Sequence, residues 1–436
     1  MRLHPLVLGM LALGAGCGPR ADAPDVLLVT LDTFRADHLG VAGYPRATTP
    51  RLDALAASGL RLEACRAPMS TTLPSHLSLF TGTHPLRHGV LANLSGDRVF
   101  ERDPSLATVP EAFAGAGYAT AAFVSAFVLR PEAGLDAGFT RYDAPEGAQR
   151  SGRETVDRAL AWWSRHQGAP RFLWVHLFDP HLPHEPPAET QVQFQGDQQA
   201  PEILAARGIP ARPELIAHLN GYDRELLHTD ALVGELLDAA GSQAVVLVVG
   251  DHGEGLWQHG WEAHGYLWDE QLRVPALLRA PGVAPGCDPN PCALMDLAPR
   301  LLSQVPALAR SPVARAVTGQ SQRTRVTLGA GHLALATAER AQVHALERAG
   351  WSEGPWSLIR RVPRSTPDAV EYDLFHLDED PGQERNRAAT EPAVVRRLEE
   401  RLLRTAADLL TGTEPRIRAA TGEERAHLEA LGYGGD

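Results

Sequence analysis

The sequence contains no lysine: all 41 of its basic residues are arginine, in a chain of 436 residues. This absence excludes every mechanism that depends on a lysine amine. Cysteine is scarce as well, with four residues, so a fold held together mainly by disulfides is excluded. The 53 acidic residues leave a net charge of −12, which argues against nucleic acid or an anionic membrane surface as the main partner.

The amino-terminal segment lacks an apolar run long enough for a permanent membrane helix. Residues 1–16 (MRLHPLVLGMLALGAG) combine Arg2 with a short apolar stretch, as in a cleavable signal peptide. They run into GAGC at 14–17, which resembles the lipobox of bacterial lipoproteins and implies cleavage before Cys17 and a lipid on its thiol. A plain secretory signal with a chance cysteine is the alternative. Both kinds of signal predict export to the bacterial periplasm or outer membrane. The lipobox-like run favours a lipid anchor at Cys17.

The other three cysteines lie within the main part of the chain. Cys287 and Cys292 enclose the loop-like run DPNP, and in an oxidising compartment we expect them to form a disulfide. A zinc half-site is the alternative, but no second pair of cysteines follows. Cys65 is expected to be a small buried apolar residue rather than a nucleophile.

Apolar, β-branched runs alternate with helical patterns over the first 280 residues or so. Strands are expected at Asp25–Leu31, Ala119–Val124, Phe172–Phe178 and Ala244–Val249. Helices are expected at Arg51–Ser58, Pro110–Ala116, Glu154–His166 and Asn220–Ala239. The alternation predicts an α/β fold with a mostly parallel central sheet sandwiched by helices.

The pattern changes after a stretch rich in proline and glycine at 281–291. Further strands are expected at Arg325–Leu328, Leu333–Thr337, Trp356–Arg360 and Asp373–Leu377, followed by an amphipathic helix at 394–411. Residues 181–215 are expected to form a long surface excursion. We therefore divide the chain into a signal peptide (1–16), a linker (17–24), a main catalytic domain (25–305), a smaller C-terminal α+β subdomain (306–390) and a helical C-terminal tail (391–436), which is expected to be loosely packed after the helix.

Acidic and histidine side chains collect where the predicted strands end. Asp32 follows the first strand, the DPH run that starts at Asp179 follows the third, and Asp251 and His252 follow the fourth. A single aspartate after a strand usually caps a helix or a turn. Because ligands of such sheets bind at the carboxyl ends of the strands, three coincidences of this kind predict a metal site instead.

The hydroxyl of Thr72 is predicted to lie beside the edge of the sheet where these strands end. Pro74 and the apolar run after it predict a helix start, which places Thr72 next to backbone N–H groups that favour an anion. A threonine that merely caps the helix is the alternative. Together with the acidic and histidine residues, Thr72 is a candidate nucleophile.

The order of these motifs resembles the sulfatase family of the alkaline phosphatase superfamily. The segments that carry the resemblance are VTLDTFRADHLG at 29–40, TTPRLDALAASGLRL at 48–62, TLPSHLSLFTGTHPLRHGV at 72–90, DPHLPHEPP at 179–187, GDHGEGLWQHGWEAHGYLWDEQLRVPALLRAPG at 250–282 and EYDLFHLDEDPGQERN at 371–386. The resemblance implies the fold of that family and an ester hydrolase as the activity.

Departures from the family pattern change the implied chemistry. The family motif C-x-P-x-R, whose cysteine becomes formylglycine, reads Thr72 to His76 here, and threonine cannot make that aldehyde. A family lysine is replaced by His264, and the family Asp-Asn pair is Asp251-His252. An imidazole ligand favours Zn²⁺ or Mn²⁺ over Ca²⁺.

The resemblance implies a role for each matching residue. Asp32, Asp251 and His252 would ligate one divalent metal, and Thr72 would be both a ligand and the nucleophile, as in superfamily relatives that cleave phosphodiesters. His181 matches the histidine of the family H-x-P motif and is the candidate that protonates the leaving oxygen.

Two further histidines stand where the family places cations that contact sulfate. His76 and His264 are expected to donate to the non-bridging oxygens of the ester. An alternative is a second metal ion held by Asp179, His181 and His264.

The sequence thus predicts an exported, metal-dependent hydrolase or transferase of phosphate esters, with diesters favoured and a phosphothreonine intermediate at Thr72. The expected partners are a small-molecule or envelope-polymer ester and the membrane through the lipid on Cys17, without a nucleic-acid polymer. The alternatives are a sulfuric ester hydrolase and a non-catalytic envelope lipoprotein that uses the fold for binding.

Overall fold

The computed structural model describes residues 23–93, 98–329, 331–336, 348–363, 369–410, 416–431 and 433. The predicted signal peptide, Cys17 and most of the linker lie outside these ranges. In the described part of the chain, no helix is both long and apolar enough to cross a membrane.

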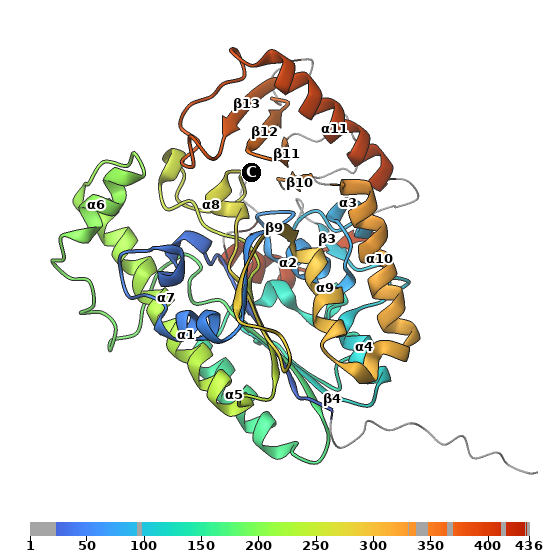
Figure 1. The fold of residues 1–436 in the computed structure, drawn as a ribbon. Helices are drawn as coiled ribbons and strands as arrows, with labels where there is room; N and C mark the ends of the chain where they lie inside the picture. Colours follow the sequence, from blue (N-terminus) through green and yellow to red (C-terminus); the bar gives the residue numbers. More distant parts are fainter. Residues whose placement is uncertain are drawn as a thin grey trace, which may run out of the picture.

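An eight-stranded sheet forms the centre of the molecule (Figure 1). In spatial order its strands are β5 (Arg141–Asp143), β4 (Ala119–Val124), β6 (Arg171–Leu177), β1 (Val26–Leu31), β7 (Val245–Gly250), β8 (Ala276–Arg279), β2 (Leu60–Arg66) and β9 (Gly286–Ala293). β8 runs antiparallel to both of its neighbours, and the other pairs are parallel. The four predicted strands of this sheet are confirmed to within one residue at each end.

Apolar side chains point to both faces of the sheet along β1, which explains why helices cover both faces. Val26 and Leu28 pack into one core, and Leu27, Val29 and Leu31 pack into the other. The helices on the first face are α2 (Thr72–Thr81), α4 (Val109–Gly115), α9 (Leu294–Ser303) and α10 (Pro312–Leu328), and those on the second are α1 (Pro50–Ser58), α5 (Gly152–Arg165) and α7 (Pro213–Ala240) (Figure 1).

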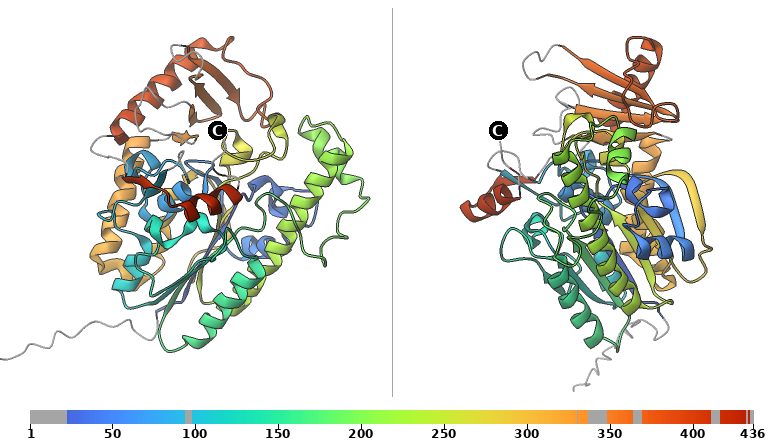
Figure 2. Two further views of the ribbon diagram at one scale, coloured as in Figure 1. Left: turned by 180° about the vertical axis from the view of Figure 1, so that it is seen from behind. Right: turned by 90° about the vertical axis from the view of Figure 1, so that its left-hand side faces the viewer.

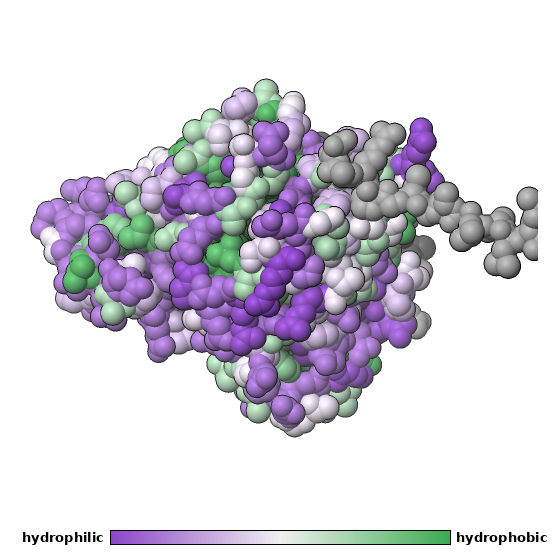
Figure 3. All heavy atoms as spheres, turned by 90° about the horizontal axis from the view of Figure 1, so that it is seen from below, coloured by the Kyte–Doolittle hydropathy of each residue, from purple (hydrophilic) through white to green (hydrophobic). Residues whose placement is uncertain are grey.

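The chain between β6 and α7 holds the expected surface excursion. It contains one short helix, α6 (Gln199–Ala206), which projects from the body of the molecule (Figure 1). The underside of the molecule carries mainly hydrophilic side chains, with apolar side chains in small separate groups (Figure 3).

A second, antiparallel sheet stands beside the first (Figure 2). It is formed by β10 (His332–Leu335), β11 (Arg348–Glu353), β12 (Trp356–Arg361) and β13 (Glu371–His376), and α11 (Pro392–Leu410) packs against it. The strand predicted at Arg325–Leu328 is wrong. That segment is the last turn of α10, which starts at Pro312 after the Ser311 side chain accepts a hydrogen bond from Ala314 N. The capped helix continues through Arg325–Leu328, although the short alternation of apolar and polar residues there is typical of a strand.

The C-terminal segment packs more tightly than the sequence predicts. β14 (Arg416–Ala419) pairs with β3 (Arg98–Glu101), and α12 (Gly422–Ala430) follows it. Leu428 is fully buried, and the buried pair Arg130–Glu424 joins α12 to the main domain at 3.0 Å. β14 and α12 are therefore packed against the main domain rather than loosely attached to it.

The predicted disulfide between Cys287 and Cys292 is wrong, because the structure has both as free thiols. Both residues lie on β9, which is extended between them, so they are held apart. Cys287 is exposed, whereas Cys292 is buried opposite Cys65 of the neighbouring strand β2. The burial expected for Cys65 is confirmed.

Candidate active site

The hydroxyl of Thr72 lies at the centre of the candidate site. Thr72 is the first residue of α2, where unpaired backbone N–H groups favour negative charge. The first turn of this helix is fixed by Leu73 N, which donates to Asn93 Oδ1 at 2.8 Å. Thr72 Oγ1 lies 3.3 Å from Asp32 Oδ2 and 3.4 Å from His252 Nε2. The fold therefore brings these three predicted site residues into hydrogen-bonding range.

Strand pairing explains why the two aspartates meet. β1 and β7 are parallel and in register, with Leu31 opposite Gly250, so the residues that follow them emerge side by side. Asp251 N donates to Leu31 O at 3.1 Å, and Thr33 N donates to Asp251 Oδ1 at 3.3 Å. Thr33 has a φ of 49°, a costly left-handed conformation that turns the chain away directly after Asp32.

Each aspartate leaves one buried oxygen without a hydrogen-bond partner in the described part of the chain. These atoms are Asp32 Oδ1 and Asp251 Oδ2. Burial raises the pKa of the Asp32 carboxyl well above its usual range. Burial, and then the charge of Asp32, does the same to the pKa of Asp251. Two crowded carboxylates with unpaired oxygens are costly unless a cation lies between them.

His252 completes a set that fits a divalent cation. Its Nδ1–H donates to Gly253 O at 3.0 Å, so the lone pair of Nε2 faces the aspartates. Nε2 lies 3.8 Å from Asp32 Oδ1 and 3.7 Å from Asp251 Oδ2. One ligand atom from each of the three residues falls within 4.8 Å of the others. Two carboxylates, an imidazole and the nearby Thr72 hydroxyl form a donor set that fits a divalent cation.

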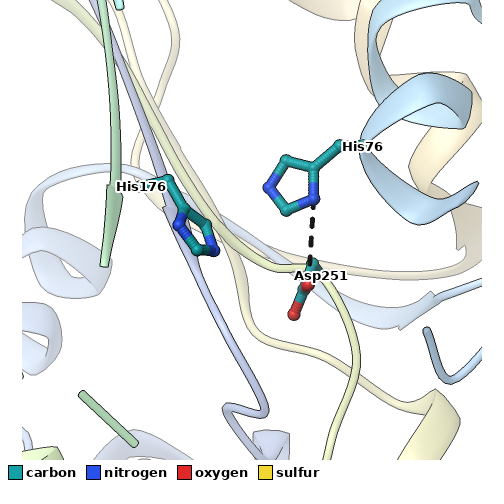
Figure 4. A group of neighbouring side chains, drawn as sticks. All are labelled: His76, His176 and Asp251. Atoms are coloured by element: carbon teal, nitrogen blue, oxygen red, sulfur yellow. Dashed lines mark ion pairs between the residues drawn. The ribbon is translucent and has the colours of Figure 1, made fainter. Parts of the chain in front are cut away.

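His76 supports Thr72 from within the helix. Its Nδ1–H donates to Thr72 O at 2.8 Å, and its Nε2 accepts from Thr30 Oγ1 at 2.9 Å. Trp174 Nε1 donates to the same Thr30 oxygen at 2.9 Å. The Thr30 hydroxyl therefore accepts from Trp174 and donates its own proton to His76 Nε2. Both nitrogens are therefore used, and neither faces the space beside Thr72 Oγ1. In Figure 4, His76 lies above Asp251, whose Oδ2 is 3.8 Å from His76 Nδ1.

His176 is a site residue that the sequence analysis missed. It lies on β6 opposite Thr30 of β1, and its Nε2–H donates to Asp32 Oδ2 at 3.2 Å. Burial lowers the pKa of His176 to about 3, so it donates as a neutral imidazole. It faces His76 and Asp251 in Figure 4. A lone histidine in the apolar run FLWVHLF was the available signal, but only strand register shows that it reaches Asp32.

His181 and His264 face each other next to Thr72. His181 Nδ1–H donates to Leu182 O at 2.6 Å, and His264 Nδ1–H donates to Ser70 O at 2.9 Å. Their Nε2 atoms, both left with a lone pair, are 3.2 Å apart. Burial lowers the pKa of His181 to about 3 and that of His264 to about 4, so both are neutral at pH 7 in the free site.

Asp179 does not join these histidines, so the predicted second metal site at Asp179, His181 and His264 is wrong. Within the described ranges, no metal-sized group of His, Cys, Asp or Glu contains Asp179. Its Oδ1 instead accepts from Gly152 N at 2.9 Å, at the first residue of α5. This hydrogen bond holds the Asp179 carboxylate against the first turn of α5.

Tyr433 is the second site residue that sequence reasoning missed. Its Oη lies 3.4 Å from Thr72 Oγ1 and 3.4 Å from His181 Nε2. No motif or periodicity marks this tyrosine, and 361 positions separate it from Thr72.

Known proteins share both the sequence pattern and the fold. The sulfatase family profile matches residues 24–307. Arylsulfatase A of Homo sapiens is 26% identical over 386 residues, which cover 74% of this chain and 71% of that protein. The ulvan-active sulfatase of Formosa agariphila is 25% identical over 302 residues, which cover 60% of this chain and 57% of that protein. The structure of a phosphonate monoester hydrolase of Agrobacterium radiobacter matches with a TM-score of 0.68 at 19% identity, covering 91% of this chain and 99% of that one.

The fold and these similarities place the chain among the hydrolases of the alkaline phosphatase superfamily. Within that superfamily the chain belongs to the sulfatase family, because the family profile covers more than half of it. This family is metal-dependent, and the cluster of Asp32, Asp251 and His252 would hold the metal here.

Proposed function

We propose that this chain is an exported hydrolase of phosphate esters, diesters above all, that forms a phosphothreonine at Thr72. The observation that carries the proposal is the threonine hydroxyl itself, which stands between Asp32 and His252 at the start of a buried helix. Threonine cannot be converted to formylglycine, so a hydroxyl must attack directly.

Asp32 is placed to take the proton of the nucleophile. Thr72 Oγ1 donates to Asp32 Oδ2, which puts this carboxylate within reach of the hydroxyl proton. As Thr72 Oγ1 bonds to phosphorus, the bond from phosphorus to the leaving oxygen breaks. His76 holds Thr72 O and so fixes the first turn of α2 during this step, which makes it a positioning residue.

His181 is placed to supply the proton that the leaving oxygen needs. Its Nε2 lone pair faces the space beside Thr72, and its pKa of about 3 keeps it neutral in the free site. The negative charge of a bound phosphodiester raises that pKa and lets Nε2 take up a proton before it passes the proton on.

A divalent cation held by Asp32, Asp251, His252 and Thr72 would lower the pKa of the threonine hydroxyl and offset charge on the transferring group. We propose Zn²⁺ or Mn²⁺ because of the imidazole ligand. Anchoring to a membrane through a lipid on Cys17 is part of the same proposal and rests on the lipobox-like run alone.

A sulfuric ester hydrolase is the second candidate. The names of the curated relatives favour it, since arylsulfatase A and the ulvan-active enzyme are sulfatases. Phosphate and sulfate esters share a tetrahedral shape, so the site would accept both. A binding protein without catalysis is less favoured, because the nucleophile and every predicted ligand of the first metal come together.

Paired assays separate these candidates. Purified protein is chelated, loaded with Zn²⁺, Mn²⁺ or Ca²⁺, and given bis(p-nitrophenyl) phosphate or p-nitrophenyl sulfate. We expect faster cleavage of the phosphodiester, restored by Zn²⁺ or Mn²⁺. Faster cleavage of the sulfate ester, or recovery with Ca²⁺ alone, would favour the sulfatase, and no cleavage with no metal affinity would favour the binding protein.

A further inference from the structure

Tyr433 follows α12 near the C-terminus, and its hydroxyl lies between Thr72 and His181. Its hydroxyl lies 3.4 Å from Thr72 Oγ1, the nucleophile, and 3.4 Å from Nε2 of His181. Its ring centroid is 6.2 Å from the rings of both His181 and His264. A tetrahedral group bonded to Thr72 Oγ1 would enter this same space, so the phenol hydroxyl would be its neighbour.

The segment that carries Tyr433 is built into the fold. Tyr433 N donates to Leu428 O at 2.9 Å at the end of α12, and Leu428 is fully buried. Arg130 Nε donates to Glu424 Oε1 at 3.0 Å, a pair almost wholly shielded from water. In the left view of Figure 2, α12 lies in dark red across the main domain. These contacts anchor α12 to the main domain and place Tyr433 beside Thr72.

In the free site, each neutral histidine already donates its one N–H group, so none is left for an anion until His181 takes up a proton. In four of them Nδ1–H donates to a backbone carbonyl: His76 to Thr72 O, His181 to Leu182 O, His252 to Gly253 O and His264 to Ser70 O. The fifth, His176, donates its Nε2–H to Asp32.

The chain also has no lysine to serve as a cationic side chain there. Among the described side chains in contact with Thr72 Oγ1, Tyr433 therefore brings the one hydroxyl available to an incoming anion. A phenol hydroxyl has an O–H group to donate, so it can offer a hydrogen bond to an anion bound beside Thr72.

We propose that Tyr433 is a catalytic residue whose hydroxyl donates a hydrogen bond to a non-bridging oxygen of the group transferred to Thr72. The proposal rests on Thr72 as the nucleophile of the proposed function, but it holds for a phosphoryl and a sulfuryl group alike. A donor of this kind acts most strongly in the transition state, where charge on those oxygens develops.

The test uses Tyr433→Phe, which keeps the ring and removes only the hydroxyl. We expect kcat/KM to fall about 100-fold, mostly through kcat, with no change in melting temperature. Tyr118→Phe is the matched control, because Tyr118 donates its hydroxyl to Pro24 O at 3.1 Å near the opposite end of the sheet. This control is expected to keep wild-type turnover.

Binding of tungstate, a tetrahedral oxyanion, gives a second readout that does not depend on turnover. Calorimetry is expected to show about tenfold weaker binding by Tyr433→Phe than by the wild type or Tyr118→Phe. The kinetic comparison uses whichever ester the wild type cleaves. A wild type that cleaves only the sulfate ester would therefore overturn the phosphate proposal and leave the test of Tyr433 intact. Tyr433→Phe within twofold of the wild type in both measurements would overturn the role of Tyr433.

Discussion

Replacing Asp251 by asparagine is expected to have opposite effects on stability with and without metal. In the metal-free wild type, Asp251 Oδ2 and Asp32 Oδ1 are buried without a hydrogen-bond partner among the described residues. Burial and the neighbouring Asp32 make Asp251 costly to ionise, and Asp251→Asn removes that cost, which is expected to stabilise the chelated protein by about 1–2 kcal/mol. The same change removes a metal ligand, so the variant should lose the stabilisation that metal gives the wild type.

The size of that metal effect follows from mass action. At a free metal concentration about 100 times its Kd, binding stabilises the folded state by about 2.7 kcal/mol. Unfolding entropy is about 2.1 cal/mol/K per residue, so roughly 400 residues give about 0.8 kcal/mol per kelvin. The melting temperature of the wild type is therefore expected to rise by about 3 °C on loading, and that of Asp251→Asn by well under 1 °C.

Differential scanning fluorimetry of chelated and Zn²⁺- or Mn²⁺-loaded protein measures both effects. Asp238→Asn serves as the control, because it removes a carboxylate that is 69% exposed on α7, far from the site. It should melt like the wild type in both states. A metal-induced rise in melting temperature as large for Asp251→Asn as for the wild type would contradict the role of Asp251 as a metal ligand. A chelated variant that melts below the chelated wild type would contradict the predicted cost of burying Asp251 without metal.

Three further expectations concern single groups. Thr72→Ser should keep measurable turnover and Thr72→Ala should lose at least about 10³-fold, as judged by steady-state kinetics; full activity in Thr72→Ala would rule out the nucleophile. Hydrogen bonds from Arg418 lower the pKa of Glu424 from 4.5 to about 2, so its ionised form stabilises the fold above pH 4.5 and this contribution is lost as the pH falls towards 2. Glu424→Gln should therefore unfold at lower urea concentration than the wild type at pH 7 and at the same concentration near pH 2, and a pH-independent difference would contradict this assignment. Iodoacetamide should label Cys287 in the folded protein and Cys292 only after unfolding; equal rates would contradict the burial of Cys292.

Local signals predict the central sheet and most of the first metal site. The runs DVLLVTL and AVVLVV are apolar on both faces, which only a buried parallel strand tolerates over that length. Asp32 and Asp251 follow those strands, and parallel strands deliver their carboxyl ends to one edge. Adjacent residues predict the helix start at Thr72, and only the acidic and histidine residues at the strand ends make this threonine a candidate nucleophile.

What the sequence could not reveal depends on long-range packing. His176 reaches Asp32 only through the register of β6 against β1, and Tyr433 reaches Thr72 only because α12 docks on the main domain. Asp179 follows a strand just as Asp32 does, yet its carboxylate accepts a hydrogen bond from the first residue of α5 and is not part of the metal-sized groups of the described residues. The segment Arg325–Leu328 alternates like a strand, but the helix that begins at Pro312 continues through it.

The most direct test of the central claim is acid-quench mass spectrometry of the peptide that contains Thr72, during turnover of bis(p-nitrophenyl) phosphate. Wild-type protein is expected to show phosphate on Thr72 that appears and decays within the turnover time, with the same modification on serine in Thr72→Ser. Turnover of the diester without any phosphate on this residue would contradict a nucleophilic threonine.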